Sequence, residues 1–391
     1  MKPALSRNLT AAPGPIDGHR NVLSGGLSYL SYNWAPRHAS GHPMDPEASN
    51  PASEPAVTTP RPGGGRWAAG AADFARLQHG PVLSRVDDLG VVELEGPDSG
   101  AFLNSQSTAD IAAMSSASWQ LGGYCTAKGR LLATFEAWRW QSGLRLLLPS
   151  DLVQSSLRQL SKFVLRAKVR LRDASAAWAA VGLCGPGSAQ ALANANIEAP
   201  EQPWQCRELE ADGRIARLPT GAGCAERILL VVPAEHLDEW LARLVQFAQV
   251  DKGVWWWAQV DAAIPAVFEA TRELFVPQAV NLEVLGGVSF RKGCYPGQEV
   301  VARSQYLGKL RRRLALAHAD TLGETSDVFH SDGASAVGRI VMAAAAPGGG
   351  WDLLFECPTE LTQRGSLHAG GRDAPALVLR ALPYRIFDPT A

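Results

Sequence analysis

The residues best suited to chemistry lie in one short stretch, residues 292–299, which reads KGCYPGQE. It places a thiol, Cys294, near a cation, Lys292, and a positive neighbour favours the thiolate, the form that acts as nucleophile or metal ligand. Its glycines and proline free or restrict the backbone at fixed points, which predicts a tight loop that presents polar side chains to a ligand. The candidate functional residues are Lys292, Gly293, Cys294, Tyr295, Gly297, Gln298 and Glu299. The alternative is an inert, buried cysteine in a tight turn.

The segments on either side must position this loop. An apolar, alternating run at residues 284–290 predicts a strand before it, and residues 300–302 predict a strand or a helix after it. A catalytic cysteine needs a base, usually a histidine. The nearest histidines in sequence, His318 and His330, do not form a recognisable catalytic motif with Cys294. We therefore assign no catalytic residue.

Four further segments accompany the loop. They read FLNSQSTAD at residues 102–110, YCTAKGR at residues 124–130, FVPQAVNL at residues 275–282 and LGGVSF at residues 285–290. Together with KGCYPGQEVVAR, these segments closely resemble the YgfZ family of folate-binding proteins. That family is related to T-protein, the aminomethyltransferase of the glycine-cleavage system, and to mitochondrial iron-sulfur-cluster assembly factors. The resemblance extends from about Pro81 to the C-terminus.

The resemblance implies a protein that binds folate, as tetrahydrofolate or a one-carbon derivative. It also implies support for the assembly or repair of iron-sulfur clusters and, through iron-sulfur enzymes, an indirect effect on tRNA modification. The implied partners are the folate itself and iron-sulfur enzymes or assembly proteins. In this role Cys294 would lie exposed beside the bound folate, with Lys292 supporting its reactivity.

The resemblance also suggests folate-binding residues. In T-protein relatives, a carboxylate within an R-x-E-A-G stretch contacts the pterin ring, and QVDAA at residues 259–263 aligns with it. Asp261 keeps a carboxylate, which can accept two hydrogen bonds from the N–H groups of the aminopyrimidine edge. A helix cap or a surface acid is the alternative, and Gln and Ala replace the usual Arg and Gly. The tentative folate-binding residues are Asp261, Gln278, Asn281 and Arg303.

A second departure concerns the reaction. T-proteins place two aspartates just beyond the glycine hairpin, and one of them acts in folate chemistry. The aligned residues here are Ala133 and Thr134, and neither can ionise to a carboxylate. This argues against aminomethyl transfer, although folate binding could survive. Two alternatives stay open: a folate-dependent one-carbon transferase, and a protein-only scaffold for an iron-sulfur partner.

The composition is typical of a folded protein without a strong overall charge. Of 391 residues, 46% are hydrophobic and 19% charged, enough for a large core divided among two or three domains. The formal net charge is -1, so we expect no direct binding of nucleic acid. A local basic cluster is formed by Lys309, Arg311, Arg312 and Arg313, with Arg303. It is either a solvated strand edge or a site for an anionic tail, such as the glutamates of a polyglutamylated folate.

The cysteines and the apolar runs indicate the compartment. Six cysteines are scattered without CxxC spacing, which favours a reducing compartment and argues against a metal site held by this chain alone. No run of about 18 apolar residues is present, so we expect no membrane contact. The expected location is the cytoplasm. Residues 1–66, rich in Pro, Gly, Ser and Ala, predict a disordered extension or a start codon assigned too far upstream.

An internal repeat predicts the architecture. A strand, a Gly-Pro turn and a helix at residues 91–104 recur at residues 179–192, and a strand-proline-helix pattern at residues 146–152 recurs at residues 230–237. Each half reads strand, helix, strand, strand, helix, a split β-α-β unit of ferredoxin-like type. The two halves would leave a crevice between them, where ligands usually bind.

The predicted fold class is therefore α+β. The first repeat covers residues 67–175 and the second residues 176–305, which carry the loop. Short apolar segments after residue 306 predict a small antiparallel β-barrel at residues 306–391. These segments are residues 310–317, 336–344, 351–356 and 376–379. The tryptophans at residues 255–257 cannot all face one ligand in a regular element, so core or interface packing is expected.

Overall fold

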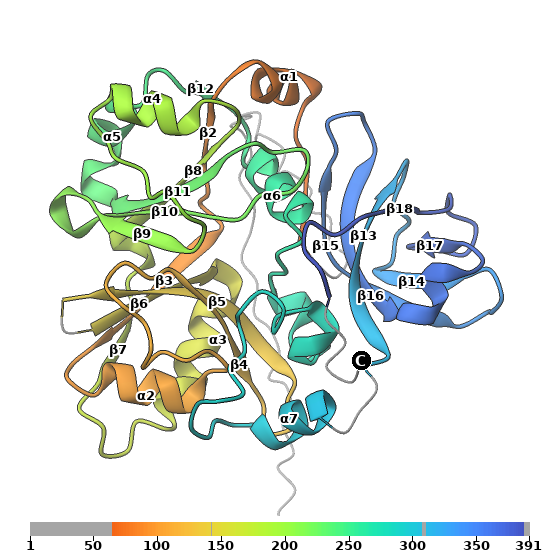
Figure 1. Ribbon diagram of the computed structural model, residues 1–391, viewed down its shortest axis with the longest axis horizontal. Coiled ribbons are helices and arrows are strands. Elements are labelled where there is room, and N and C mark those ends of the chain that lie inside the picture. Colours follow the sequence, from red (N-terminus) through yellow and green to blue (C-terminus); the bar gives the residue numbers. More distant parts are fainter. Residues whose placement is uncertain (1–64, 142, 307–309, 387–391) are drawn as a thin grey trace, which may run out of the picture. The chain divides into compact units, whose positions relative to one another are not determined.

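The computed structural model describes residues 65–141, 143–306 and 310–386. Residues 1–64, which carry nearly all of the predicted disordered extension, lie outside the described residues. The described chain forms three β-sheets, two of them with helices in tandem α+β repeats (Figure 1). Before the repeats come β1 (Gly65–Trp67) and α1 (Ala71–His79).

The first repeat is a five-stranded antiparallel sheet with two helices. Its elements are β3 (Leu89–Glu95), α2 (Ser99–Gln106), β4 (Gln120–Cys125), β5 (Leu131–Trp140), β6 (Gly143–Pro149), α3 (Ser150–Ser161) and β7 (Arg170–Asp173). The strand order is β4-β5-β6-β3-β7. Three strands, not two, separate its helices. The extra strand β4 contains Gly122 and Gly123, where an added Cβ would lie 2.6 Å from Phe135 Cζ and 2.7 Å from Leu131 Cδ2.

The second repeat has the same strand order. Its elements are β8 (Trp178–Cys184), α4 (Ser188–Asn194), β9 (Gln205–Glu208), β10 (Arg214–Arg217), β11 (Arg227–Pro233), α5 (Leu237–Arg243) and β12 (Ala248–Gln249). The sheet runs β12-β2-β8-β11-β10-β9, so β9-β10-β11-β8 corresponds to β4-β5-β6-β3. The internal repeat is confirmed, but its unit is not the predicted two-stranded split β-α-β motif.

The strand before the first repeat belongs to the second sheet. β2 (Val82–Arg85) pairs antiparallel with β8, in the position that β7 takes beside β3 in the first sheet. The first repeat therefore begins after residue 85 and not at residue 67 as predicted. β12 is only two residues long and pairs with β2 and not with β8. The edge of β8 is therefore covered by β2, which precedes both repeats in the chain.

The C-terminal sheet is open. Its strands are β13 (Arg312–Ala319), β14 (Asp327–His330), β15 (Ala336–Ala345), β16 (Trp351–Pro358), β17 (Leu367–Ala369) and β18 (Val378–Arg380). The four predicted strands are present as β13, β15, β16 and β18. The order is β17-β14-β15-β16-β13-β18, and β1 pairs with β15 in parallel. The sheet is an antiparallel half-barrel and not the predicted closed barrel, because its three-residue end strands do not pair with each other.

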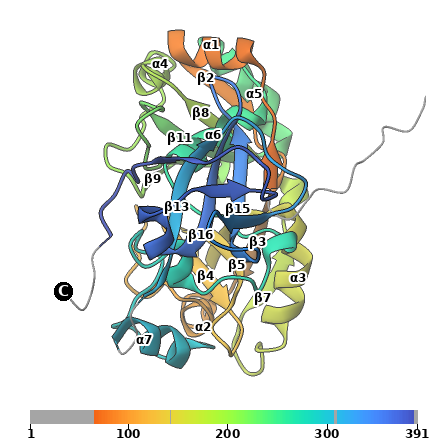
Figure 2. The same ribbon diagram turned by 90° about the vertical axis from the view of Figure 1, so that its right-hand side faces the viewer.

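Helix α6 (Lys252–Asp261) connects the second repeat to this sheet. Seen from the C-terminal side, β13, β15 and β16 lie in front of α6 (Figure 2). All three tryptophans of α6 are buried, with exposed fractions of 2%, 2% and 3%, which confirms core packing. Trp256 stacks on Trp67 at a centroid distance of 4.2 Å, and Trp257 Nε1 donates to Asp352 at 2.8 Å.

The segment before the sequence motif is irregular. Residues 284–286 form a turn and residues 287–290 are irregular, so the predicted strand is absent. Thr108 Oγ1 donates to the carbonyl of Gly287 at 2.5 Å, and Ser289 N donates to the carbonyl of Thr108 at 2.9 Å. The backbone groups therefore bind the chain after α2, so that they are not available for pairing within a sheet.

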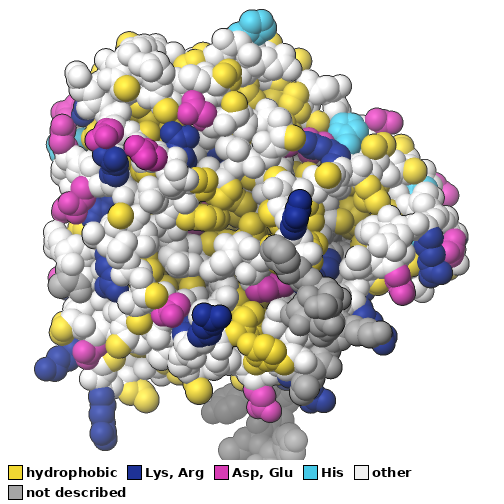
Figure 3. All heavy atoms as spheres, in the orientation of Figure 1, with side chains coloured by type: hydrophobic (Ala, Val, Ile, Leu, Met, Phe, Trp, Pro, Cys, Tyr) yellow, Lys and Arg dark blue, Asp and Glu magenta, His cyan; other side chains and the backbone are white. Residues whose placement is uncertain are grey.

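Charged side chains of both signs occur on the face of the described residues shown in Figure 3. On the face in Figure 3, basic and acidic side chains are interspersed, and no large patch of one sign is visible. None of the described helices is long and apolar enough to cross a membrane.

Candidate functional site

The predicted loop leads directly into a helix. Residues 293–297 precede α7 (Gln298–Tyr306), which packs against the turn between β4 and β5. Gly297 has a φ of +82°, and an added Cβ would lie 2.4 Å from the carbonyl oxygen of Thr126. Val300 of α7 approaches Gly129 of the same turn. The KGCYPGQE loop and the YCTAKGR turn are therefore in contact, although about 170 residues separate them.

Gly297→Ala is expected to lower the free energy of unfolding by about 2 kcal/mol, because a side chain is disfavoured at positive φ and would press on the Thr126 backbone. Urea unfolding measures the loss. Gly293→Ala is the matched control, since nothing lies within 4 Å of its added Cβ. Equal stability of the two variants would contradict this packing.

Lys292 anchors the loop to the first repeat. Its ammonium group donates to the carbonyls of Asn104 and of Ser107, the latter at 2.6 Å, and lies 5.0 Å from the ring centroid of Tyr295. Burial lowers the pKa of Lys292 to about 8, although the Asp110 carboxylate opposes this. The lysine charge is thus held by backbone carbonyls at the end of α2. Its predicted support of the Cys294 thiolate stays a prediction.

The lowered pKa of Lys292 predicts a pH dependence of stability. Between about pH 8 and pH 10.5, the folded lysine is neutral while the unfolded lysine is protonated, so unfolding takes up a proton. This residue's contribution to stability should therefore rise with pH through that window and be lost as pH falls through 8. Urea unfolding of wild type and Lys292→Met at pH 7.5 and pH 10 measures it. The same change with pH in both proteins would contradict the assignment.

Cys294 is the exposed cysteine. The other five, all within the described residues, are buried: Cys125, Cys184, Cys206, Cys224 and Cys357. Burial raises the pKa of Cys125 to about 12, that of Cys206 to about 11 and that of Cys357 to about 12. The Cys294 sulfur is thus open to solvent, and the inert, buried alternative does not describe its surroundings.

One equivalent of a chromogenic disulfide reagent is expected to react rapidly with the native protein at pH 8, because accessibility and thiolate fraction control the rate. All six thiols should react once the chain is unfolded. Cys294→Ser should remove the fast phase and leave the slow one unchanged. A fast phase that survives this substitution would show that another cysteine is accessible.

Asp261 is buried, with an exposed fraction of 1%. Its carboxylate accepts from Gly223 N at 2.8 Å and from Arg380 Nη2 at 2.6 Å. Arg380 also donates to Asp352 at 2.7 Å. Asp261 therefore joins the end of α6 to strand β18, and both of its oxygens already accept a hydrogen bond. Its role as a folate ligand stays a prediction.

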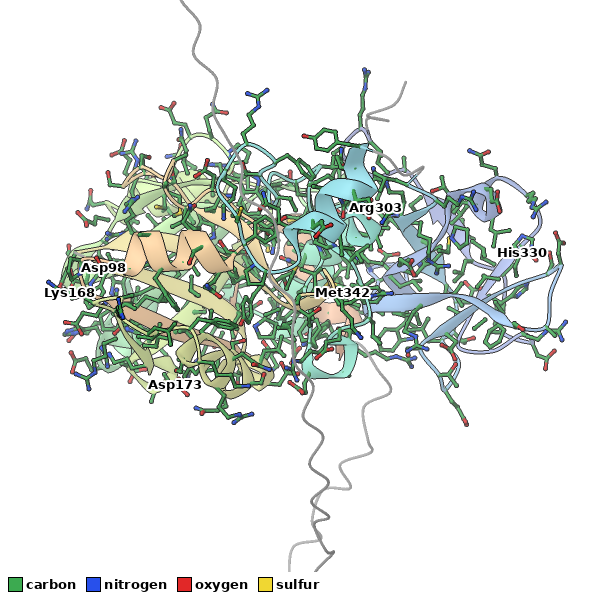
Figure 4. The ribbon with its side chains drawn as sticks, turned by 90° about the horizontal axis from the view of Figure 1, so that it is seen from below. Asp98, Lys168, Asp173, Arg303, His330 and Met342 are labelled. Atoms are coloured by element: carbon green, nitrogen blue, oxygen red, sulfur yellow. The ribbon has the colours of Figure 1, made fainter. Side chains whose placement is uncertain are left out.

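The other tentative folate-binding residues lie around the start of the C-terminal sheet. Gln278 and Asn281 are fully buried in the turn before residue 282, and each has a side-chain oxygen without a partner among the described residues. Gln278 Nε2 donates to the carbonyl of Val301 in α7 at 2.7 Å. Arg303 is exposed on α7 (Figure 4). Gln298 and Glu299 form the first turn of that helix.

The structure adds a carboxylate that the sequence argument missed. A cavity of about 30 Å³ lies where the two repeats meet α6. Thr134 and Glu136 of β5 both line it, because residues two apart in a strand face the same side. Leu229 of the second repeat and Gln259 of α6 also line this cavity. Position 134 carries no carboxylate, and Glu136, two residues further along the same strand face, brings one to this cavity.

Glu136 is partly buried and held by one hydrogen bond. Trp119 Nε1 donates to its carboxylate at 2.5 Å. Burial raises the pKa of Glu136, while Arg227 and the Trp119 hydrogen bond oppose the rise. Residues 131–140 form a largely apolar strand with a single acid, and this is the signal that could have identified Glu136.

Arg227 lies behind this cavity in the second repeat. It is fully buried, donates through Nη2 to Gln259 Oε1, and stacks 4.3 Å above the Trp255 ring. Within the described part of the chain, its Nε and Nη1 have no hydrogen-bond partner. Buried donors without partners are rare and require an explanation, such as a ligand or an ordered water molecule.

The histidines nearest the motif in sequence lie elsewhere. His318 Nδ1 contacts Asp352 at 3.0 Å, and His330 Nε2 contacts the carbonyl of Arg364 at 2.7 Å. Figure 4 shows His330 well away from Arg303. Among the described residues, no group of three His, Cys, Asp or Glu side chains could hold a metal ion.

Comparison with known proteins gives close and distant relatives. No protein-family model matches the chain. The chain is 30% identical over 315 residues to the tRNA-modifying protein YgfZ of Vibrio vulnificus, covering 78% of this chain and 93% of that protein. It is 32% identical over 235 residues to the YgfZ protein of Yersinia pestis, covering 60% and 69%.

A solved structure shares the fold. It is the glycine cleavage system aminomethyltransferase T of Bartonella henselae, at a TM-score of 0.62 over 80% of this chain and 88% of that one. The sequence identity is 15%, so this likeness concerns the fold alone. It agrees with two α+β repeats followed by an antiparallel half-barrel sheet.

Proposed function

Because the chain belongs to the YgfZ family of tRNA-modifying proteins, we propose that it binds a reduced folate in the crevice between its two repeats. In this proposal the bound protein supports the assembly or repair of iron-sulfur clusters. Its effect on tRNA modification is then indirect, through iron-sulfur enzymes that modify tRNA. The T-protein-like fold supports a folate as the ligand.

One observation carries the folate proposal: the Glu136 carboxylate lines the cavity at which both repeats and α6 meet. A pterin ring presents an amino group and ring N–H donors on one edge, beside a carbonyl acceptor. A carboxylate can accept hydrogen bonds from these N–H groups, and a guanidinium can donate a hydrogen bond to the carbonyl. Glu136 supplies the first group. Arg227 lies behind Gln259 and Trp255, which line the cavity, and its two unused donors would serve the carbonyl once the cavity widens.

The cavity between the repeats must widen to admit a ring. At about 30 Å³ it has room for roughly one water molecule. An adjoining cavity of about 240 Å³ is lined by Trp67, Phe268 and Pro149, and Pro149 borders both spaces. The Trp67–Trp256 stack stands between them. Movement of these aromatic side chains would join the two spaces and provide faces against which a pterin could stack.

Cys294 is assigned to the iron-sulfur role. Its exposed thiol lies on a loop fixed by Lys292 and Gly297, so it is available to a partner protein or to a cluster in transit. The test uses a bacterial strain that lacks its own family member and measures an iron-sulfur tRNA-modifying activity. Wild type should restore the activity, and Cys294→Ala should fail to restore it. Equal rescue by both proteins would remove the thiol from the proposal.

A one-carbon transferase is the second candidate, and the position of Glu136 favours it. The argument against transfer was the missing acid at positions 133 and 134, yet Glu136 places an acid on the same strand face. Transfer predicts turnover of methylene-tetrahydrofolate with a suitable amine or thiol acceptor. Turnover that is abolished in Glu136→Gln would establish it, and no turnover across a broad acceptor panel would leave folate binding alone.

A further inference from the structure

A third cavity, of about 470 Å³, lies where α7, the β4–β5 turn and the start of β13 meet. It is lined by polar and charged side chains together with an apolar wall. The polar lining residues are Arg130, Gln278, Ser304, Arg311, Arg312 and Glu356. Leu274 and Val276 belong to the apolar wall. Its size is within the range of small-molecule sites.

The charges of this cavity leave two arginines available. Arg312 is neutralised, because its Nε and Nη2 both donate to the Glu356 carboxylate. Arg130 uses Nη1 for the carbonyl of Leu274, at 2.7 Å, which leaves most of its five N–H donors unused. The guanidinium of Arg311 is exposed and has no partner among the described residues. Two cations with open donors thus face a cavity whose one acid is already paired.

Gln278 closes the floor of the cavity. It is fully buried, and its Nε2 donates to the carbonyl of Val301, which fixes the orientation of the amide. Its Oε1 has no partner within the described chain but is itself buried, so a ligand in the cavity does not contact it. The groups open to a ligand are therefore the guanidinium groups of Arg130 and Arg311 and the apolar wall.

The basic cluster expected from the sequence contributes only in part. Arg313 is buried, paired with Glu283 and bonded to the carbonyl of Gln278 at 3.1 Å. Arg303 does not line the cavity, and Lys309 lies outside the described residues. Arg130, about 180 residues earlier in the chain, joins the cluster through folding.

We propose that this cavity binds the γ-glutamyl chain of a polyglutamylated folate. The inference rests on the proposed folate function and names the form of folate. The α-carboxylates of the chain bind Arg130 and Arg311, as charge-assisted pairs. The methylene groups of the chain pack against Leu274 and Val276.

The cavity between the repeats, which Glu136 lines, and the cavity that Arg130 lines are separated by a distance that an elongated ligand can span. Arg130 stands at the start of β5, and Glu136 lies six residues further along, about 20 Å at 3.3 Å per residue. The segment at residues 265–276 borders both cavities. Folate is a long molecule with the pterin at one end and the glutamates at the other, which matches Glu136 and Arg130 respectively.

The test compares tetrahydrofolate carrying one glutamate with the form carrying three, by calorimetric titration of the full chain. Wild type should bind the triglutamate form about 10-fold or more tightly, the effect of one charged hydrogen bond. The double variant Arg130→Ala, Arg311→Ala should bind the two forms alike. Arg158→Ala, at an exposed arginine of α3 outside the cavity, should keep the wild-type difference. Equal affinities in wild type, or a difference that survives in the double variant, would overturn the inference.

A second measurement separates this inference from the proposed function. The peptide γ-Glu-γ-Glu-γ-Glu, which has no pterin, should bind wild type weakly and the double variant not at all. If neither folate form binds while the peptide does, the folate function fails and the carboxylate site stands. If inorganic phosphate displaces the peptide at equal concentration, the cavity is a general anion site and the inference is overturned.

Discussion

Replacing Glu136 by alanine is expected to weaken tetrahydrofolate binding by about 10- to 100-fold. A hydrogen bond to a charged group contributes about 1.5–3 kcal/mol, and each 1.4 kcal/mol changes the affinity tenfold. Glu136 lines the cavity between the repeats, and its carboxylate accepts one hydrogen bond from the described residues, that of Trp119. Titration calorimetry of both proteins at pH 7 measures the change. Unchanged affinity in the alanine variant would place the pterin elsewhere.

Two further variants make this prediction specific. Glu136→Gln keeps the size and one acceptor oxygen but loses the charge, so we expect a smaller loss, of about threefold to tenfold. Asp261→Ala tests the residue suggested by the sequence, whose carboxylate is bound by Gly223 and Arg380. If Asp261 only joins α6 to β18, its variant should be less stable but bind folate normally at a temperature where it is folded.

Replacing Asp352 by alanine is expected to lower the free energy of unfolding by about 3 kcal/mol. Its buried carboxylate accepts from Trp257 Nε1 at 2.8 Å, Arg380 Nη1 at 2.7 Å and His318 Nδ1 at 3.0 Å. Removing it leaves a buried indole N–H and part of a guanidinium without an acceptor, which is the costly way to break such a pair. Urea unfolding followed by tryptophan fluorescence measures the loss.

The control for Asp352 is a nearby acid on the surface. Asp320 lies 3.8 Å from His318 with a side chain that is 85% exposed, so Asp320→Ala should change stability by no more than about 0.5 kcal/mol. Asp352→Asn keeps an oxygen acceptor and should lose less than Asp352→Ala. A loss below 0.5 kcal/mol in Asp352→Ala would show that this network does not fasten α6 to the C-terminal sheet.

Much of the fold was predictable because its signals are local. The Gly-Pro turns and strand-proline-helix patterns marked both repeats, and period-two apolar segments marked four strands of the C-terminal sheet. The prediction was wrong at residues 284–290, where an alternating pattern arises in an irregular segment bound to Thr108. It also missed β4, because the paired glycines of that strand have low strand propensity and are there to let Phe135 and Leu131 approach.

The site was predictable only where it is continuous in sequence. The tight loop around Cys294 was predicted from residue types, and the exposure of the thiol agrees with the role that the family resemblance implied. Arg227 comes from the other repeat, and Arg130 meets Arg311 only after the C-terminal sheet folds against α7. These contacts depend on packing between residues that are far apart in the chain, and a single sequence does not reveal such packing. Glu136 is the intermediate case, since strand alternation alone places it on the face of Thr134.

Calorimetric titration of the full wild-type chain with tetrahydrofolate at pH 7 tests whether this protein binds folate at all. Wild type should bind one molecule per chain, with an affinity that falls in Glu136→Ala and is unchanged in the surface variant Asp320→Ala. No binding by wild type would rule out folate as the ligand, and an unchanged affinity in Glu136→Ala would rule out the cavity between the repeats as its site.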